Sequence, residues 1–272
     1  MKQVIVITGS TGGVGQLIAR GLGSKNRHII CVGRNESLLI NQVNELASTS
    51  SPEAKFSYRV TDMMDAVHVD NVARSILHEF GKIDMWINNV GVNNIKAMGP
   101  TWGVEPSEWL KEVELNLFTA FAGTSAAIKV MKDQPKGYVV NLGGGGADTP
   151  KPFGSAYGAA KAAVVKFSET VNQELVEQGY NIRAFCFNPG FIRNTRTEAL
   201  VESDIAQKYM PILAEVMNSD KMSSIDDSLF VLESICSGDV DELAGGYLFA
   251  DTFKQNLDSG LDKQSFYLRC NN

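Results

Sequence analysis

Short apolar runs alternate along the chain with longer stretches in which apolar residues recur every three or four positions. The short runs are rich in β-branched residues, which is typical of strands buried on both faces of a sheet. The longer stretches have the spacing of amphipathic helices. The predicted strands are 4–7, 28–32, 56–60, 83–87, 138–142, 182–187 and 247–250, and the helices between them are 13–22, 36–47, 67–80, 106–131 and 156–178.

Strands that alternate with helices of ten or more residues indicate βαβ units, whose right-handed crossovers produce a parallel sheet. The fold class is therefore α/β. A helical segment rich in Met and Glu, residues 194–224, interrupts the alternation after the sixth strand, and we find no long linker or repeat. We expect a single domain over residues 1–255 and a C-terminal tail over 256–272, in which only Phe266 to Leu268 shows an apolar pattern.

The composition agrees with a globular protein: 272 residues, 44% hydrophobic and 21% charged, can bury a large core. A net charge of −6 provides no basic surface for nucleic acid or for an acidic membrane. The four cysteines and three histidines have no metal-ligand spacing, so no metal site is predicted. The N-terminal apolar run is too short for a signal peptide, and no stretch approaches the ~18 apolar residues of a membrane span. We expect a cytoplasmic location.

A glycine-rich loop joins the first strand to the first helix. It runs from Thr8 to Gly15, with glycines at positions 9, 13 and 15. Such glycines allow a tight turn and let the backbone approach a pyrophosphate without a Cβ atom, while the helix N-terminus presents free N–H groups. A loop of this kind can be ordinary turn chemistry. Its place at the start of a βαβ series favours a dinucleotide site.

The second strand ends in Cys31-Val32-Gly33-Arg34. An acid usually stands here when the cofactor has a free ribose 2′-hydroxyl, and none occurs before Glu36. Arg34 offers instead a forked set of donors for a 2′-phosphate, although it could simply be a solvated arginine. The sequence therefore favours NADP(H) over NAD(H).

Tyr157 and Lys161 lie four residues apart in a predicted helix and share one face of it. A nearby ammonium group lowers the pKa of a tyrosine. That suits a general acid that donates a proton to a carbonyl oxygen while a hydride reaches the carbonyl carbon. Taken alone the pair is a weak signal, because such residues on an amphipathic helix are usually at the surface.

Together these features resemble the short-chain dehydrogenase/reductase (SDR) family of the Y-x-x-x-K type, over about residues 1–251. Residues 8–15 match the TGxxxGxG loop of that family, and residues 88–91 match its NNAG motif with Val90 in place of alanine. Asn188-Pro189-Gly190 matches the motif beside the nicotinamide. The resemblance implies a Rossmann-type doubly wound sheet of about seven parallel strands with helices on both faces, residues 194–224 as a substrate lid, and a dimer or tetramer.

The resemblance also implies roles for individual residues. Tyr157 would be the acid/base, Lys161 would bind the nicotinamide ribose and tune Tyr157, and Asn116 would hold a water behind Lys161. Asn116 could instead be a helical polar residue bonded to backbone, and Asp62 a capping acid. The residues implied in cofactor binding are Gly9, Ser10, Thr11, Gly13, Val14, Gly15, Arg34, Asp62, Asn89, Gly91, Tyr157, Lys161, Pro189, Gly190 and Ile192.

The chain departs from the family pattern 13 residues before the tyrosine, where the family carries a serine that polarises the substrate carbonyl. That position is Gly144, within the run 143–146 of four glycines. Candidate replacements are Thr149, Ser155 and the backbone N–H groups of the run. The run itself could be a flexible loop or an enlarged, backbone-lined pocket. Asn194 also departs, since it stands where a threonine is common.

We therefore predict an NADP(H)-dependent oxidoreductase that acts on a carbonyl, an alcohol or a related small molecule. Because the serine is missing, two alternatives stay open. One is an enzyme without redox chemistry, such as a dehydratase, isomerase or cyclase, that uses Tyr157 as its base. The other is a dinucleotide-binding module without redox activity.

Overall fold

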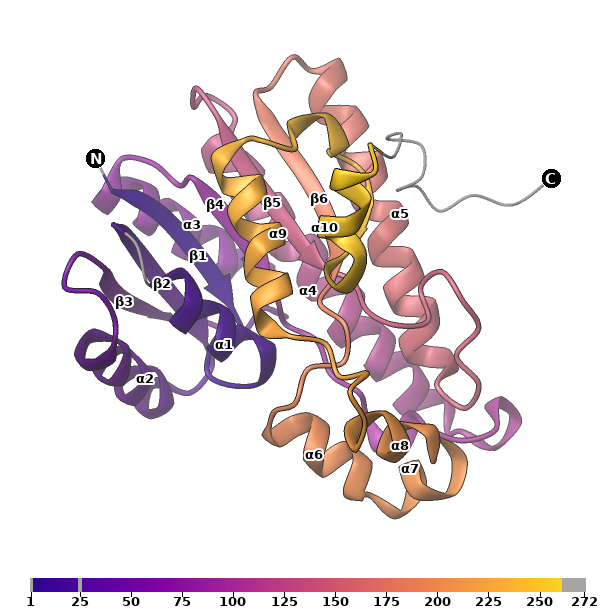
Figure 1. Ribbon diagram of the computed structural model, residues 1–272. Helices are drawn as coiled ribbons and strands as arrows, with labels where there is room; N and C mark the ends of the chain where they lie inside the picture. Colours follow the sequence, from indigo (N-terminus) through magenta and orange to yellow (C-terminus); the bar gives the residue numbers. More distant parts are fainter. Residues whose placement is uncertain (1, 24–25, 261–272) are drawn as a thin grey trace.

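The computed structural model describes residues 2–23 and 26–260 (Figure 1). Seven parallel strands form one sheet in the order β3-β2-β1-β4-β5-β6-β7. The chain starts in the middle of this sheet, builds one half outward through β3, and then builds the other half from β4. This doubly wound order confirms the predicted α/β fold. The strands are β1 Gln3–Thr8, β2 Arg27–Gly33, β3 Lys55–Val60, β4 Met85–Asn88, β5 Gly137–Leu142, β6 Ile182–Asn188 and β7 Tyr247–Phe249.

Helices cover both faces of the sheet (Figure 1). One face carries α1, α2, α9 and α10, and the other carries α3, α4 and α5. Their ends follow from local chemistry: Asn35 and Asp65 cap α2 and α3, and Gly81, with a φ of +74°, ends α3. The long helices are α1 Gly13–Leu22, α2 Glu36–Thr49, α3 Ala66–Phe80, α4 Pro106–Met131, α5 Ser155–Glu177, α9 Ile225–Ser237 and α10 Ala250–Asp258.

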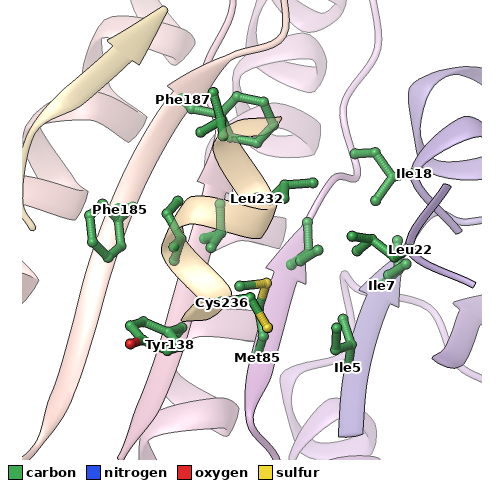
Figure 2. Packing of buried hydrophobic residues seen from close by; sticks show 14 of the residues in the cluster. Ile5, Ile7, Ile18, Leu22, Met85, Tyr138, Phe185, Phe187, Leu232 and Cys236 are labelled. Carbon is green, nitrogen blue, oxygen red and sulfur yellow. The ribbon is translucent and has the colours of Figure 1, made fainter. Parts of the chain in front are cut away.

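The core lies in two layers, one on each side of the sheet. In β1, Ile5 and Ile7 belong to one buried cluster, and Val4 and Val6 to the other. Successive side chains of a strand point to opposite faces, so a strand covered on both sides needs a continuous apolar run. Figure 2 shows the first layer, where Ile18 and Leu22 of α1 and Leu232 of α9 pack over the sheet.

The segment 194–224 forms three short helices: α6 Thr195–Glu202, α7 Asp204–Tyr209 and α8 Ile212–Met217. They lie together at one end of the molecule, past the helices that cover the sheet (Figure 1). Their apolar residues form a separate small cluster around Leu200, Ala206 and Met210, to which Met98 also contributes. This segment is thus tied to the loop after β4 rather than to the main core.

The C-terminal part contains a helix that the sequence pattern does not reveal. The sequence pattern predicts no helix after the strand 247–250, but α10 begins at Ala250 and continues to Asp258, across the expected boundary at residue 255. Its buried residues are Ala250 and Phe253, and Phe253 packs against Phe230 of α9. The aromatic run at 266–268 lies outside the described residues. Within the described ranges, no helix is long and apolar enough to cross a membrane.

Candidate functional site

A cavity of about 660 Å³ opens at the carboxyl ends of the central strands. Its walls are the loops after β1, β4, β5 and β6, the first turns of α5, and the helices α6 and α8. Ligands of open α/β sheets bind at this edge, where the strand order reverses between β1 and β4. The cavity therefore lies where a doubly wound fold carries its binding site.

The loop after β1 has the geometry of a phosphate cradle. Gly9 and Gly13 have φ angles of +62° and +57°, which residues with a Cβ atom rarely adopt. A Cβ atom on Gly15 would lie 2.3 Å from Asn89 Nδ2 and 2.6 Å from the Gly9 carbonyl oxygen. Asn89 fixes the loop by donating to the carbonyl oxygens of Thr8 (2.9 Å) and Gly9 (3.1 Å). Gly13, Val14, Asn89 and Gly91 line the cavity, so a pyrophosphate could approach the backbone of the loop.

Ser10 serves the loop's own structure. Its hydroxyl is fully buried and donates to Gln42 Oε1 (3.0 Å), while Gln42 Nε2 donates back to the Ser10 carbonyl oxygen (2.6 Å). The resemblance implied that Ser10 binds the cofactor. Its side chain instead faces α2, and Ser10 lies outside the cavity lining. The sequence contained a signal for Gln42, because this polar residue lies on the same helix face as Leu39 and Leu46. All three side chains are buried in the structure.

Arg34 and Asp62 lie side by side after β2 and β3. Arg34 Nη1 is 3.8 Å from Asp62 Oδ2, and both side chains are largely exposed. Asp62 Oδ1 also accepts the Met64 N–H (3.0 Å) in the loop before α3, but the residue that caps α3 is Asp65 and not Asp62. Neither residue lines the main cavity. They lie past the ends of the next two strands outward from β1, on the side where a cofactor's adenosine half would extend.

Three further residues converge at the cavity: Tyr157 and Lys161 line it, and Asn116 lies outside the lining. Lys161 Nζ donates to the Leu142 carbonyl oxygen (3.0 Å) and lies 5.6 Å from the centre of the Tyr157 ring. A Cβ atom on Gly91 would lie 2.7 Å from Asn116 Oδ1 and 3.1 Å from Lys161 Nζ. The structure thus brings Tyr157, Lys161 and Asn116 together around the loop after β4.

The side-chain amide of Asn116 is bonded to backbone. Its Nδ2 donates to the carbonyl oxygens of Val92 and Glu112 (both 2.9 Å), and its Oδ1 accepts the Val92 N–H (3.2 Å). These bonds hold the loop after β4 against α4. They agree with the simpler of the two readings of Asn116, and leave its function in a proton relay as a proposal.

The electrostatics of Tyr157 differ from the sequence-based expectation. Burial, and then the negative charge of Glu112, raise the pKa of Tyr157 well above its usual range. Burial also lowers the pKa of Lys161 to about 8. We expected the lysine to lower the tyrosine pKa, but desolvation is the larger effect. Tyr157 is therefore protonated at neutral pH, the state that a proton donor needs.

Gly144 lies against the tyrosine. A Cβ atom on Gly144 would be 2.5 Å from Tyr157 Oη. Behind it, Tyr247 Oη accepts the Gly144 N–H (3.2 Å) and donates to the Gly144 carbonyl oxygen (2.9 Å). Tyr247 is 2% exposed and was not singled out in the sequence. The family's serine position is thus occupied by a backbone segment that a buried tyrosine holds in place.

The candidate replacements for the serine differ in whether they present a free hydrogen-bond donor to the cavity. The Gly144 N–H is bonded to Tyr247 and is not directed at a ligand. Ser155 Oγ accepts a hydrogen bond from Trp109 Nε1 (3.1 Å), and Thr149 is exposed and outside the cavity lining. Gly145 does line the cavity, and among the described residues no group accepts its N–H. Of the candidates, only the Gly145 N–H stays available at the cavity wall.

Two charged residues near the site were missed. Lys151 lines the cavity, with Nζ 5.0 Å from the centre of the Tyr157 ring. Glu112, one turn before Asn116, is 1% exposed; its Oε1 accepts the Asn94 N–H (2.9 Å), and its Oε2 has no partner among the described residues. Burial raises the pKa of Glu112 to about 7. The sequence signal for Glu112 is its spacing: it lies four residues before Asn116 and shares with it the buried face of the helix 106–131.

The loop after β6 completes the wall. Gly190 has a φ of +78°, and a Cβ atom there would lie 1.9 Å from Ser223 Oγ, so the position requires glycine. Ile192 is buried and lines the cavity together with Pro189. Asn194 caps α6 by accepting the N–H groups of Arg196 and Thr197, which explains an asparagine at this point. The described residues contain no cluster of three or more His, Cys, Asp or Glu that could hold a metal.

Comparison with known proteins agrees with this geometry. The sequence model of the family described as short chain dehydrogenase matches residues 3–206. A 2,3-dihydro-2,3-dihydroxybenzoate dehydrogenase of Bacillus subtilis is 30% identical over 188 residues, which is 69% of each chain. A D-beta-hydroxybutyrate dehydrogenase of Rhizobium meliloti is 28% identical over 221 residues, covering 77% of this chain and 83% of that protein.

Solved structures share the fold. Levodione reductase superposes with a TM-score of 0.80 at 24% identity, covering 95% of this chain and 98% of that one. Actinorhodin polyketide ketoreductase with NADPH superposes with a TM-score of 0.77 at 22% identity, covering 91% and 95%.

Proposed function

The chain belongs to the short-chain dehydrogenase family, whose members are oxidoreductases that use a nicotinamide dinucleotide, and on that premise we propose that it is an NADP(H)-dependent enzyme of the Y-x-x-x-K type that interconverts a carbonyl compound and its alcohol. One observation carries the proposal. Tyr157 lines the cavity beside the glycine loops, and Lys161 lies 5.6 Å from the centre of its ring.

The residues present fit the dinucleotide. Gly12 and Gly13 leave the cavity wall without side chains, and a Cβ atom on Gly12 would project to within 3.3 Å of the Arg196 guanidinium. A pyrophosphate there would meet the N-terminus of α1, Gly13–Leu22, and a cation from the lid. Lys161 and Gly91 would face the nicotinamide ribose. The cofactor, when bound, supplies or accepts the hydride.

Tyr157 supplies the proton in this proposal. In the reducing direction its hydroxyl gives a proton to the carbonyl oxygen as the carbonyl carbon gains a hydride, so that the C=O double bond becomes an alcohol. The ammonium of Lys161 then stabilises the tyrosinate, which regains a proton from solvent through the groups behind it. Tyr157 is protonated at neutral pH, and this is the state in which it can donate a proton during reduction.

The choice of NADP(H) rests on Arg34. It is exposed after β2, and its nearest acid, Asp62, is 3.8 Å away and itself exposed, so the guanidinium is accessible to a phosphate. A planar guanidinium binds a phosphate through two parallel hydrogen bonds. A ribose hydroxyl has a single oxygen and cannot accept such a pair. NAD(H) is the alternative cofactor.

A second function is favoured by Gly144. Without a hydroxyl at this position, the carbonyl oxygen has one polarising donor fewer, and removing one such donor typically costs about 10²–10³ in rate. Tyr157 could then serve as the acid or base of a dehydratase, isomerase or cyclase. The presence of Tyr157 and Lys161 together makes hydride chemistry the better proposal, and the two functions are separable by experiment.

The test is the oxidation of NADPH, followed by the loss of its nicotinamide absorbance, with a panel of ketones, aldehydes, oxo acids and imines. We expect at least one class of carbonyl compound to be reduced in proportion to the enzyme added. NADH should support slower turnover at equal concentration. If bound NADPH transfers no hydride to any class of compound, while another reaction depends on Tyr157, the proposal is wrong and the second function replaces it.

A further inference from the structure

The charges around the cavity have one sign. The charged residues among those that line it are Lys151, Lys161 and Arg196, and none of the lining residues is an Asp or Glu. This contrasts with the chain as a whole, which has a net charge of −6. A cationic cavity in an acidic protein concentrates anionic ligands.

Two of the three cations have a place in the proposed cofactor site. A Cβ atom on Gly12 or Gly13 would lie 3.3 Å from the Arg196 side chain, so that guanidinium belongs to the phosphate loop. Lys161 lies beside Gly91, behind Tyr157. Lys151 has neither contact. It reaches the cavity from the loop after β5, and its ammonium lies 5.0 Å from the centre of the Tyr157 ring. The cofactor does not account for its charge.

The chain is shaped to admit the Lys151 side chain. A Cβ atom on Gly146 would lie 2.7 Å from Lys151 Cβ and 3.0 Å from its Cδ, and one on Gly154 would lie 3.1 Å from its Cδ and Cε. Any larger residue at either position would therefore displace the lysine stem. The glycine run that removes the family's serine thus also makes room for a lysine beside the tyrosine.

The Lys151 ammonium forms no direct pair with an acid of the described residues. Burial lowers the pKa of Lys151, and the negative charge of Glu112 opposes that shift. Glu112 lies outside the cavity lining, and burial raises its own pKa to about 7. Glu112 is therefore partly protonated at neutral pH, and the positive charge of Lys151 is left for a ligand.

The rest of the wall defines the ligand's other end. Ile95 of the loop after β4, Leu200 of α6, and Leu213 and Val216 of α8 give the cavity an apolar side. A cation beside the tyrosine and apolar residues elsewhere in the same cavity fit a molecule with one charged end and a hydrocarbon end. A single lysine carries one positive charge, which a monoanionic carboxylate would neutralise.

We propose that Lys151 binds the carboxylate of the substrate, which is then an oxo acid, or the corresponding hydroxy acid, with an apolar chain. The assignment rests on the proposed oxidoreductase function. In it the ammonium holds the carboxylate while Tyr157 protonates the neighbouring carbonyl oxygen. The carbonyl carbon gains the hydride, the oxygen gains the tyrosine proton, and the carboxylate is unchanged.

The first experiment compares acids with their neutral esters. The substrates are 2-oxohexanoate, 3-oxohexanoate and the methyl ester of each, reduced with NADPH by the wild type, Lys151→Met, Lys151→Arg and a control, Lys166→Met, on the exposed side of α5. The readout is the ratio of kcat/KM for each acid to that for its ester, so a general loss of activity cancels.

The wild type should prefer at least one acid to its ester. Lys151→Met should lower that ratio by about 10- to 100-fold, the usual effect of losing a hydrogen bond to a charged group. Lys151→Arg should keep most of the preference, and Lys166→Met should leave it unchanged. The proposal is overturned if the wild type reduces esters as well as acids, or if Lys151→Met leaves the ratio unaltered.

The second experiment needs no turnover. NADP⁺-loaded protein is titrated calorimetrically with hexanoate and with hexanamide, two unreactive probes that differ in charge. We expect hexanoate to bind the wild type more tightly, with the difference lost in Lys151→Met. If no carbonyl compound is reduced but this preference holds, the carboxylate site stands and the oxidoreductase proposal falls. Equal binding of the two probes by the wild type overturns the site, whether or not the variant folds.

Discussion

The hydroxyl of Tyr157 occupies the space that a side chain at Gly144 would need, since a Cβ atom built there would lie 2.5 Å from Tyr157 Oη. The tyrosine and the glycine are therefore coupled: the proton donor has its present position only because residue 144 ends at Cα. Tyr247 reinforces this arrangement by bonding both the N–H and the carbonyl oxygen of Gly144.

Substitutions at Gly144 should move the tyrosine. Gly144→Ala displaces Tyr157 Oη without adding a donor, so kcat should fall by about tenfold or more, because small misplacements of a reacting group are costly. Gly144→Ser makes the same displacement but adds a hydroxyl, and should be about tenfold faster than Gly144→Ala on simple ketones. Steady-state kinetics on variants with unchanged circular dichroism measure this. An alanine variant as active as the wild type would show that the close contact does not position Tyr157.

The stability of the protein should depend on pH through Glu112. Its pKa is raised from 4.5 to about 7 in the folded state, so the folded protein binds more protons than the unfolded one between these values. The contribution of Glu112 to the free energy of unfolding is fully present below pH 4.5 and is lost as the pH rises through about 7. Glu112→Gln removes this loss, and should stabilise the protein by about 2 kcal/mol at pH 8 and by less at pH 5.

Urea unfolding at the two pH values measures the difference. The matched control is Glu114→Gln, on the exposed side of the same helix. If Glu112→Gln destabilises the protein equally at both pH values, the carboxyl is ionised in the native state and the raised pKa is wrong.

Arg34 should set the cofactor preference. Arg34→Ala removes the proposed ligand of the 2′-phosphate and should weaken NADPH binding by about 10- to 100-fold, while NADH binding changes by less than about threefold. Arg74→Ala, an exposed arginine on α3, is the control. Fluorescence titration with both nucleotides gives the affinities. Equal losses for NADPH and NADH would place Arg34 elsewhere in the cofactor site.

Arg196 should act on both cofactors alike. Its guanidinium lies over Gly12 and Gly13, where the pyrophosphate common to NADPH and NADH would bind. Arg196→Met should weaken both nucleotides by a similar factor, about 3- to 30-fold, and the loss should shrink at high salt because the charge is exposed. The same titrations at low and high salt test this. A loss confined to NADPH would mean that Arg196 contacts the 2′-phosphate instead.

The fold could be predicted from the sequence because its pattern is local. A continuous apolar run such as Val4 to Ile7 indicates a strand covered on both faces, and the two core layers on either side of β1 show this arrangement. The helix α10 escaped prediction because only Ala250 and Phe253 of its residues are buried. Its position depends on contact with α9, which no local pattern reveals.

The site was predictable only in part, for the same reason. Residues that form motifs, such as Asn89 and Tyr157, could be singled out from the sequence, and the structure places both in the cavity lining. Tyr247 was missed because it meets Gly144 across 103 residues of sequence. Lys151 was missed because its access depends on Gly146 and Gly154 lying beside its stem. Contacts of this kind arise from tertiary packing, and a single sequence carries no signal for them.

The central claim is that Tyr157 donates the proton in an NADPH-dependent reduction. Tyr157→Phe removes the acidic hydroxyl and little else, so the variant should fold and bind NADPH with an affinity within about threefold of the wild type. General acid catalysis contributes about 10²–10⁴-fold, so kcat should fall at least that far. Tyr180→Phe, near the end of α5, is the control and should keep full activity.

The most direct measurement is single-turnover hydride transfer from bound NADPH to a reducible carbonyl compound, recorded for the wild type and Tyr157→Phe at the same saturation with cofactor. The account predicts rapid NADPH oxidation in the wild type and a rate lower by at least about 10²-fold in the variant. A Tyr157→Phe protein that oxidises NADPH at the wild-type rate would contradict it.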